Sequence, residues 1–225
     1  MIEVVNNDES TALYWATKYT PESLKLLIEA FEERLFEIKD NDLNTVLHWA
    51  AEYNVNSFKL LIEKFGRKVF EIVNKYNQTA LQFAIQYKPD SLKLLIDVFG
   101  EEILLLQDTL DNTILHYAAQ RNFDSLKLLI DTFGERLLAV KNIYGYTVLH
   151  TAAQARPDSL KFLVAAFPEE VERLLDEKNK FGVTVIHLAN ARDLSHLIDI
   201  DLLEATIDLL HNLFKAQSYR YQQVN

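Results

Sequence analysis

The chain has 225 residues, of which 49% are hydrophobic and 25% charged, and a formal net charge of −10. This is the balance of an ordinary globular protein, and the acidic charge argues against nucleic acid as a partner, because phosphate binding needs clustered Lys and Arg. The sequence has no Cys, which excludes disulfides, thiolate metal ligands and a cysteine nucleophile within it.

Residues 1–8 lack the basic and apolar regions of a signal peptide. No stretch of the sequence approaches the roughly 20 apolar residues that a membrane span requires. We therefore expect a soluble, cytoplasmic, monomeric protein without a membrane partner.

One sequence motif recurs along the chain every 34 residues. It begins with Thr and continues with Leu two residues later, or Ile186 in the last copy, and with Ala five residues later. The copies begin at Thr11, Thr45, Thr79, Thr113, Thr147 and, after a slip of three residues, Thr184. A period of this length is typical of solenoids, in which each repeat buries its apolar face against its neighbours.

Each repeat contains the pattern of two helices. The first helix, from about Thr45 to Tyr53 in the second repeat, carries small residues that allow a neighbouring helix to approach closely. The second helix presents an apolar stripe with the spacing i, i+3, i+4, i+7, as in Leu24, Leu27 and Ile28 followed by Phe31. We call the first the inner helix and the second the outer helix.

The two helices are joined in two alternating ways. Pro21, Pro89 and Pro157 suit the first turn of the outer helix and end the helix before it. In the other two repeats Asn54 and Asn122 are predicted to close the inner helix in a left-handed conformation. Gly66, Gly100 and Gly134 follow the outer helices and are predicted to end them.

A turn is predicted before each copy of the Thr motif. An Asx residue stands five residues before each Thr, and such side chains initiate turns by binding nearby backbone. These residues are Asn6, Asp40, Asn74, Asp108, Asn142 and Asn179. Gly145 and Gly182 add the conformational freedom that a tight turn needs.

Three copies of the motif resemble the Thr-Pro-Leu-His-x-Ala signature of ankyrin repeats, although the Pro is absent. They are TVLHWAA at 45–51, TILHYAA at 113–119 and TVLHTAA at 147–153. The resemblance covers nearly the whole chain and implies an all-α solenoid of stacked helix pairs. It implies one domain, 1–225, with repeats at about 6–39, 40–73, 74–107, 108–141, 142–178 and 179–216. The last repeat is predicted to be a C-terminal cap, followed by a frayed tail at 217–225.

Four of the six His residues, His48, His116, His150 and His187, occupy one repeat position. Successive copies would lie about 10 Å apart, too far to share a metal ion. The resemblance implies instead that this His bonds backbone in the turn, with Tyr14 and Gln82 as polar substitutes. We expect no metal, no cofactor and no catalytic residues, since no catalytic motif appears.

The aromatic residues form two groups. Trp15, Trp49, Phe83 and Tyr117 share one helix position and are predicted to pack between repeats. A second set lies at the turn tips and at the ends of the inner helices, where ankyrin-like proteins vary their binding residues, and its residue types are common at interface hot spots. These candidate partner-binding residues are Tyr19, Tyr53, Tyr76, Tyr87, Leu110, Arg121, Ile143, Tyr144, Tyr146 and Phe181.

The sequence therefore predicts a non-enzymatic module that binds a partner protein or peptide on its concave surface. The acidic net charge favours a partner with a basic surface. One alternative is a bacterial effector of ankyrin type, secreted into the host cytosol to act on a host protein. A third hypothesis is an enzyme with a site in the cap around Asp193, His196, Asp199 and His211.

Overall fold

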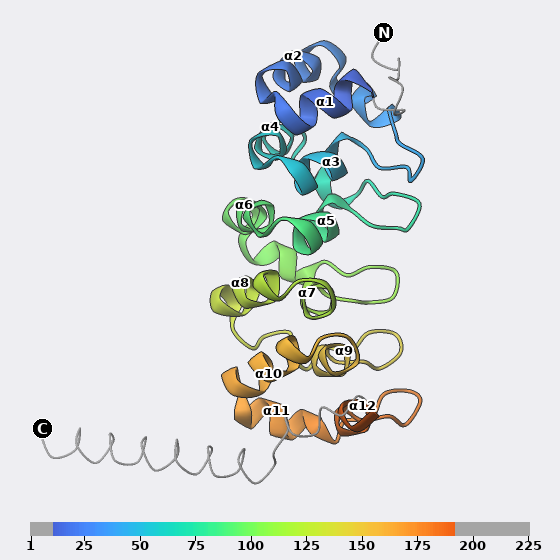
Figure 1. The fold of residues 1–225 in the computed structure, drawn as a ribbon, viewed down its shortest axis with the longest axis vertical. Coiled ribbons are helices and arrows are strands. Elements are labelled where there is room, and N and C mark those ends of the chain that lie inside the picture. Colours follow the sequence, from blue (N-terminus) through green and yellow to red (C-terminus); the bar gives the residue numbers. More distant parts are fainter. Residues whose placement is uncertain (1–10, 192–225) are drawn as a thin grey trace, which may run out of the picture. The chain divides into compact units, whose positions relative to one another are not determined.

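The computed structural model describes residues 11–191, and every regular element in this range is a helix (Figure 1). The chain forms two compact units: unit 1 ends at Asp108 and unit 2 begins at Thr109. Both units are built of helix pairs joined by extended turns, which confirms the predicted all-α fold of stacked helix pairs. Asn6, most of the predicted cap repeat with Asp193, His196, Asp199 and His211, and the predicted tail at 217–225 lie outside the described residues.

Unit 1 contains three helix pairs. Its inner helices are α1 (Ala12–Tyr19), α3 (Val46–Tyr53) and α5 (Ala80–Tyr87). Its outer helices are α2 (Pro21–Phe31), α4 (Val55–Phe65) and α6 (Pro89–Phe99), each followed by a 3-10 helix: η1 (Glu32–Glu37), η2 (Gly66–Phe70) and η3 (Gly100–Leu105). Inner helices pack on inner helices, α1 on α3 and α3 on α5, and α4 packs between α2 and α6.

Unit 2 repeats this plan with one addition. Its inner helices are α7 (Ile114–Arg121), α9 (Val148–Ala155) and α12 (Val185–Ala191), and α9 packs against both of the others. Its outer helices are α8 (Phe123–Phe133) and α10 (Pro157–Ala166). The addition is α11 (Pro168–Leu175), an α-helix in the place where unit 1 has 3-10 helices.

Helix α11 explains the slip of three residues before Thr184. Phe167 ends α10 with φ −138°, and Pro168 then opens a new helix at its first turn. The helix buries Val171, Leu174 and Leu175. The extra residues therefore lengthen a short 3-10 segment into an amphipathic α-helix, which the repeat pattern did not predict.

The predicted core positions are buried. On the outer helices Leu61, Leu95 and Leu129 are fully buried, as are the Ala residues at the centre of the inner helices, such as Ala50 and Ala118. A small side chain at that position lets adjacent inner helices approach closely. The packing pattern read from the sequence is thus confirmed.

The helix junctions confirm one prediction and correct another. Pro21, Pro89 and Pro157 stand in the first turns of α2, α6 and α10 as predicted. Asn54 and Asn122, however, are extended, with φ −144° and −149°, and not left-handed. The Asn54 side chain accepts hydrogen bonds from the backbone of Asn56 and Ser57, so it caps the start of the outer helix.

Left-handed residues stand instead after the outer helices and in the turns. Gly66, Gly100 and Gly134 end their helices with positive φ, as predicted, and Glu32 takes the same conformation in the first repeat. In each turn the fourth residue, counted from the Asx residue, also has a positive φ: Leu43, Asn77, Asp111, Gly145 and Gly182. The repeat geometry therefore fixes these conformations even where Gly is absent.

The Asx side chains organise the turns as predicted. Asp40 Oδ1 accepts hydrogen bonds from the backbone of Asp42 and Asn44, and Asn74, Asn142 and Asn179 make the same pair of bonds in their own turns. Within unit 2 adjacent turns are also joined directly, because Ile143 N donates to Leu110 O and Lys180 N to Tyr144 O. The turn tips are consequently held in register.

Candidate partner-binding surfaces

The repeated His has a structural role. His48 Nδ1 accepts a hydrogen bond from Thr45 N at 3.2 Å, and Nε2 lies 2.8 Å from the carbonyl oxygen of Gln78 in the next turn. The neutral ring with its proton on Nε2 satisfies both contacts, and burial lowers the pKa of His48. His116 and His150 make equivalent contacts, with Nε2 at 3.0 Å from Tyr146 O and 3.2 Å from Val183 O.

Gln82 and Tyr14, the two residues predicted to replace the repeated His, differ in their contacts. Gln82 completes a capping box with Thr79, as expected for a residue that replaces His. The Tyr14 side chain does not: its hydroxyl instead accepts a hydrogen bond from Lys18 Nζ at 3.2 Å. A phenol cannot reproduce the imidazole contact, since its only polar atom lies at the far end of the ring. Among residues 11–191 no cluster of His, Asp and Glu could hold a metal ion.

The exposed aromatic side chains gather on the inner helices and turns. All seven in the described range lie there: Trp15, Tyr19, Tyr53, Tyr76, Tyr87, Tyr144 and Phe181. Trp49 and Phe83 are buried as predicted, and Tyr117 is half-buried. Trp15 corrects the prediction, because 43% of its surface is exposed and it stacks on Tyr19 rather than packing between repeats.

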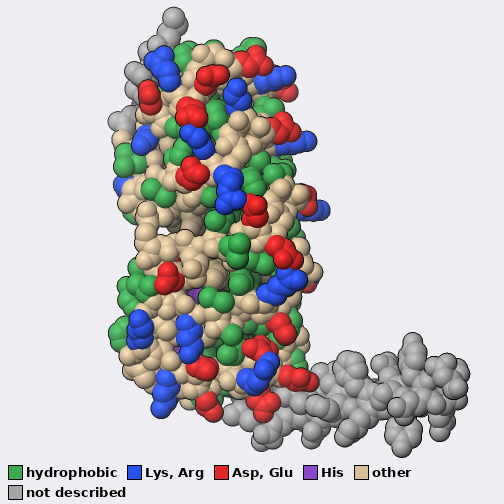
Figure 2. All heavy atoms as spheres, turned by 180° about the vertical axis from the view of Figure 1, so that it is seen from behind, with side chains coloured by type: hydrophobic (Ala, Val, Ile, Leu, Met, Phe, Trp, Pro, Cys, Tyr) green, Lys and Arg blue, Asp and Glu red, His purple; other side chains and the backbone are tan. Residues whose placement is uncertain are grey.

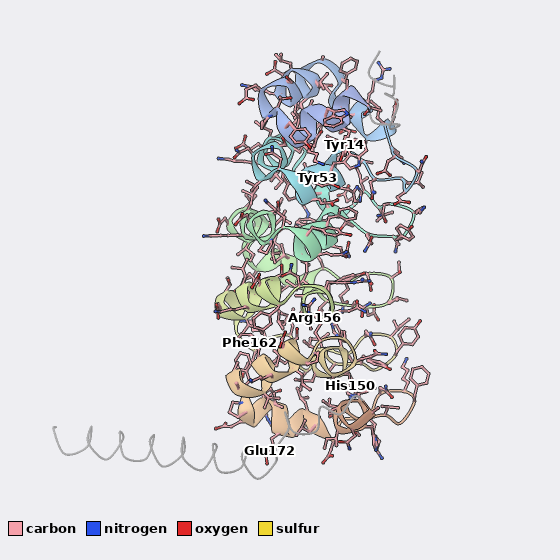
Figure 3. The ribbon with its side chains drawn as sticks, in the orientation of Figure 1. Tyr14, Tyr53, His150, Arg156, Phe162 and Glu172 are labelled. Atoms are coloured by element: carbon pink, nitrogen blue, oxygen red, sulfur yellow. The ribbon has the colours of Figure 1, made fainter. Side chains whose placement is uncertain are left out.

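In unit 1 three aromatic rings surround Lys18, and the Trp15 ring packs against two of them, those of Tyr14 and Tyr19. Figure 3 shows Tyr14 and Tyr53 side by side between α1 and α3, with ring centres 6.0 Å apart. Lys18 Nζ lies 4.2 Å from the centre of the Tyr53 ring and 5.3 Å from that of Tyr19. We call Tyr14, Trp15, Lys18, Tyr19 and Tyr53 the aromatic–lysine cluster. The hydrogen bond to Tyr14 raises the pKa of Lys18, which therefore stays charged.

Glu52 adds a carboxyl group beside this cluster. Burial raises the pKa of Glu52, and the burial of Tyr53 together with its hydrogen bond to Glu52 raises the pKa of the Tyr53 hydroxyl. Sequence reasoning selected Tyr19 and Tyr53 but missed Lys18 and Glu52. The available signal was the spacing of Tyr14 and Lys18, which places the two side chains on one face of a helix.

The other predicted residues of unit 1 lie apart from this cluster. Tyr76, 61% exposed, is at a turn tip, where Lys75 Nζ lies 5.0 Å from its ring centre. Tyr87 is exposed at the end of α5, and its ring contacts that of Phe83. Both are accessible, as predicted.

Unit 2 exposes four of its six predicted residues, and these lie along two edges. Leu110, Tyr144 and Phe181 form an apolar series on successive turns, which we call the tip ladder, and the rings of Tyr144 and Phe181 stack with centres 6.3 Å apart. Ile143 is half-buried, and so is Tyr146, whose ring lies against His150. Arg121 is exposed at the end of α7.

The acidic residues of the outer helices and of η1 are exposed. Glu32 pairs with Lys64 at 3.7 Å, and Glu33 with Lys68 at 2.6 Å. Figure 2 shows side chains of both charges interspersed on the face it presents. Exposed pairs of this kind contribute little to stability.

Comparison with known proteins places these features in a family. The family model described as ankyrin repeats (3 copies) matches residues 1–69, 33–107 and 81–172. No curated protein matches the sequence. No described helix has both the length and the apolar character needed to cross a membrane.

Several solved structures share the fold. One is a chain of the complex between the predatory endopeptidase Bd0816 of Bdellovibrio bacteriovorus and the immunity protein Bd3460, with 26% identity, a TM-score of 0.58 and coverage of 83% of this chain and 93% of that one. The ankyrin repeat domain of Bcl-3, of the IkappaB family, has 21% identity, a TM-score of 0.65 and coverage of 88% and 86%. The ankyrin repeat protein EF0377 has 21% identity, a TM-score of 0.63 and coverage of 83% and 96%. The chain belongs to the ankyrin-repeat family, whose members generally serve as non-enzymatic modules of protein–protein interaction.

Proposed function

We propose that this protein is a non-enzymatic module that binds a partner protein or peptide through its inner helices and turn tips. The distribution of exposed apolar side chains carries the proposal. Of the thirteen large hydrophobic residues exposed in the described range, nine lie on inner helices or turns, including all seven aromatic ones. Tyr and Trp bury a large area at a small entropic cost, and exposed apolar area commonly marks an interaction site.

The outer elements provide a matched comparison. They expose only Leu26, Val98 and Leu105, together with Val73 in the segment after η2. A surface variant, Tyr76→Ser, Tyr144→Ser and Phe181→Ser, removes three exposed side chains from the turns. A control variant, Leu26→Ser, Val98→Ser and Leu105→Ser, removes three from the outer elements.

Capture from cell lysate with the intact chain and both variants tests the proposal. Each substitution is at an exposed site and should change stability by only about 0.5 kcal/mol, so both variants should fold. We expect the intact chain and the control variant to retain the same proteins and the surface variant to lose them. Equal capture by all three proteins, or loss by the control variant alone, would refute the proposal.

A second candidate concerns the kind of partner. One chain of the complex between a predatory endopeptidase and an immunity protein is 26% identical to this protein and is covered over 93% of its length. This similarity favours a peptidase as the partner held by the same surface. If so, the captured proteins should include a peptidase whose activity changes when the intact chain is added. Secretion into a host cell stays a prediction, which a translocation assay of the intact chain would test.

A further inference from the structure

Charge is segregated within unit 2. Its inner helices α7, α9 and α12 contain no Asp or Glu. The inner helices and turns together, residues 109–121, 141–156 and 178–191, contain five Lys or Arg and one Asp. The outer segments, residues 122–140 and 157–177, contain four Lys or Arg and nine Asp or Glu. Among the described residues of unit 2, up to 191, the acidic charge therefore lies mainly on the outer elements, and the inner surface is locally basic.

Two arginines mark one edge of this inner surface. Arg156 Nη1 donates a hydrogen bond to the carbonyl oxygen of Arg121 at 2.9 Å, which holds the Arg156 side chain against the end of α7 (Figure 3). In the described part of the chain neither guanidinium forms an ion pair, whereas Lys141 pairs with Glu177 and Arg173 with Glu170. Arg121 and Arg156 thus keep donors available for an anionic group.

The tip ladder marks the other edge. The backbone bonds from Ile143 N to Leu110 O and from Lys180 N to Tyr144 O, both 2.9 Å, fix adjacent turns to each other. Phe181, 68% exposed, stacks on Tyr144 at the end of this ladder. A surface that is already ordered loses little conformational entropy when a partner binds.

From this arrangement we propose that unit 2 binds an acidic protein segment, whose carboxylates meet Arg121 and Arg156 and whose apolar side chains pack on Tyr144 and Phe181. Guanidinium groups suit this role because they bind carboxylates in a bidentate manner. The inference rests on the proposed function and specifies its partner. It reverses the partner charge expected from the net charge of the whole chain, since most of that charge comes from unit 1, whose residues 1–108 carry 18 Asp or Glu and 11 Lys or Arg.

Selection from a displayed library of short random peptides, with the full chain as bait, tests this proposal. Three baits are compared: the intact chain, R121E/R156E, and the control K127E/K161E, which makes the same charge change on the exposed outer faces of α8 and α10. The intact chain and the control should enrich peptides that combine Asp or Glu with Phe or Leu. The R121E/R156E bait should lose them and enrich peptides with Lys or Arg.

A selected peptide then gives a quantitative test. R121Q/R156Q should weaken its binding about tenfold or more, and the salt dependence of binding should decrease. If R121E/R156E melts at a lower temperature than the intact chain, R121Q/R156Q takes its place as bait. This bait should no longer enrich acidic peptides, and it should not enrich basic ones.

The proposal is overturned if the intact chain enriches basic or uncharged peptides or none at all, or if the arginine variant enriches the same peptides as the intact chain. It is also overturned if an oligonucleotide displaces the peptides and binds more tightly, because the anion recognised is then phosphate. The lysate experiment distinguishes failure of this inference from failure of the proposed function: proteins captured by the intact chain and lost by the surface variant uphold protein binding even when the selected peptides are not acidic.

Discussion

Units 1 and 2 bury the same repeat positions but expose different chemistry. Three of the five exposed rings of unit 1, those of Trp15, Tyr19 and Tyr53, lie on the inner helices α1 and α3 and belong to the aromatic–lysine cluster. In unit 2 the exposed rings lie on the turns, and the ends of the inner helices carry Arg121 and Arg156 instead. Buried positions repeat because every helix pair must meet its neighbour in the same way. Exposed positions are not subject to this constraint. The exposed residues that differ between the two units can therefore determine which partner each unit binds.

Truncation of buried and exposed side chains should separate the two kinds of position most strongly. Phe58 is fully buried in α4, so Phe58→Ala should lower the free energy of unfolding by about 3–5 kcal/mol. Its counterpart in unit 2, Leu126, should lose about 2–5 kcal/mol on truncation to Ala. Tyr76→Ala and Phe181→Ala should each stay within about 0.5 kcal/mol. Urea unfolding measures all four, and similar losses for buried and exposed residues would remove the distinction.

Two glycines in the turns of unit 2 predict a smaller loss of stability, and one of them serves as a control for the other. Gly145 and Gly182 share one repeat position and have φ of +77° and +74°. A Cβ on Gly145 would lie 3.0 Å from Lys180 N and 3.1 Å from Asn179 Cα, whereas a Cβ on Gly182 would meet nothing within 4 Å. Either Ala substitution should cost about 1–2 kcal/mol for the left-handed conformation, and Gly145→Ala about 1–3 kcal/mol more for the overlap.

Thermal or urea unfolding of the two Ala variants distinguishes backbone conformation from turn packing. Equal losses would mean that the adjacent turn moves away at no cost. In that case the tip ladder would not be the ordered surface that acidic-segment binding requires.

The sequence period correctly predicted the residues that pack between neighbouring repeats. Predictions from it were wrong where one repeat differs from the others. Trp15 and Trp49 occupy the same repeat position, but α3 packs between α1 and α5, while α1 has only α3 beside it among the described inner helices. Asn54 was misjudged because Asn suits both a left-handed helix end and an extended N-cap. Helix α11 was missed because it follows the slip in the repeat.

The candidate surfaces were predictable only in part. Most of the exposed aromatic residues were found, since their positions follow from the repeat. The contact of Lys18 with Tyr53 joins residues 35 positions apart in sequence on two adjacent helices, so no local pattern reveals it. The segregation of charge in unit 2 becomes visible only once inner and outer segments are assigned to their faces.

The smallest predicted effect concerns a position that both units share. Burial lowers the pKa of His48 in unit 1 and of His150 in unit 2 below the ordinary value of 6.5. The unfolded chain then binds more protons than the folded one as the pH falls below about 6.5, so the stability from these residues is complete above that pH and is lost below it. Gln82 shows that Gln can form the same capping box.

The double variant His48→Gln and His150→Gln should therefore be less stable than the intact chain near neutral pH, by about 1 kcal/mol for each lost bond to a carbonyl oxygen, yet should lose less stability on acidification. The reciprocal change, Gln82→His, should steepen the loss, because it buries a further imidazole. Urea midpoints compared above and below the ordinary His pKa measure both slopes. Unchanged slopes in both variants would mean that the acid sensitivity of the fold lies in its carboxylates and not in the repeated His, and the two units would then share this position for its hydrogen bonds alone.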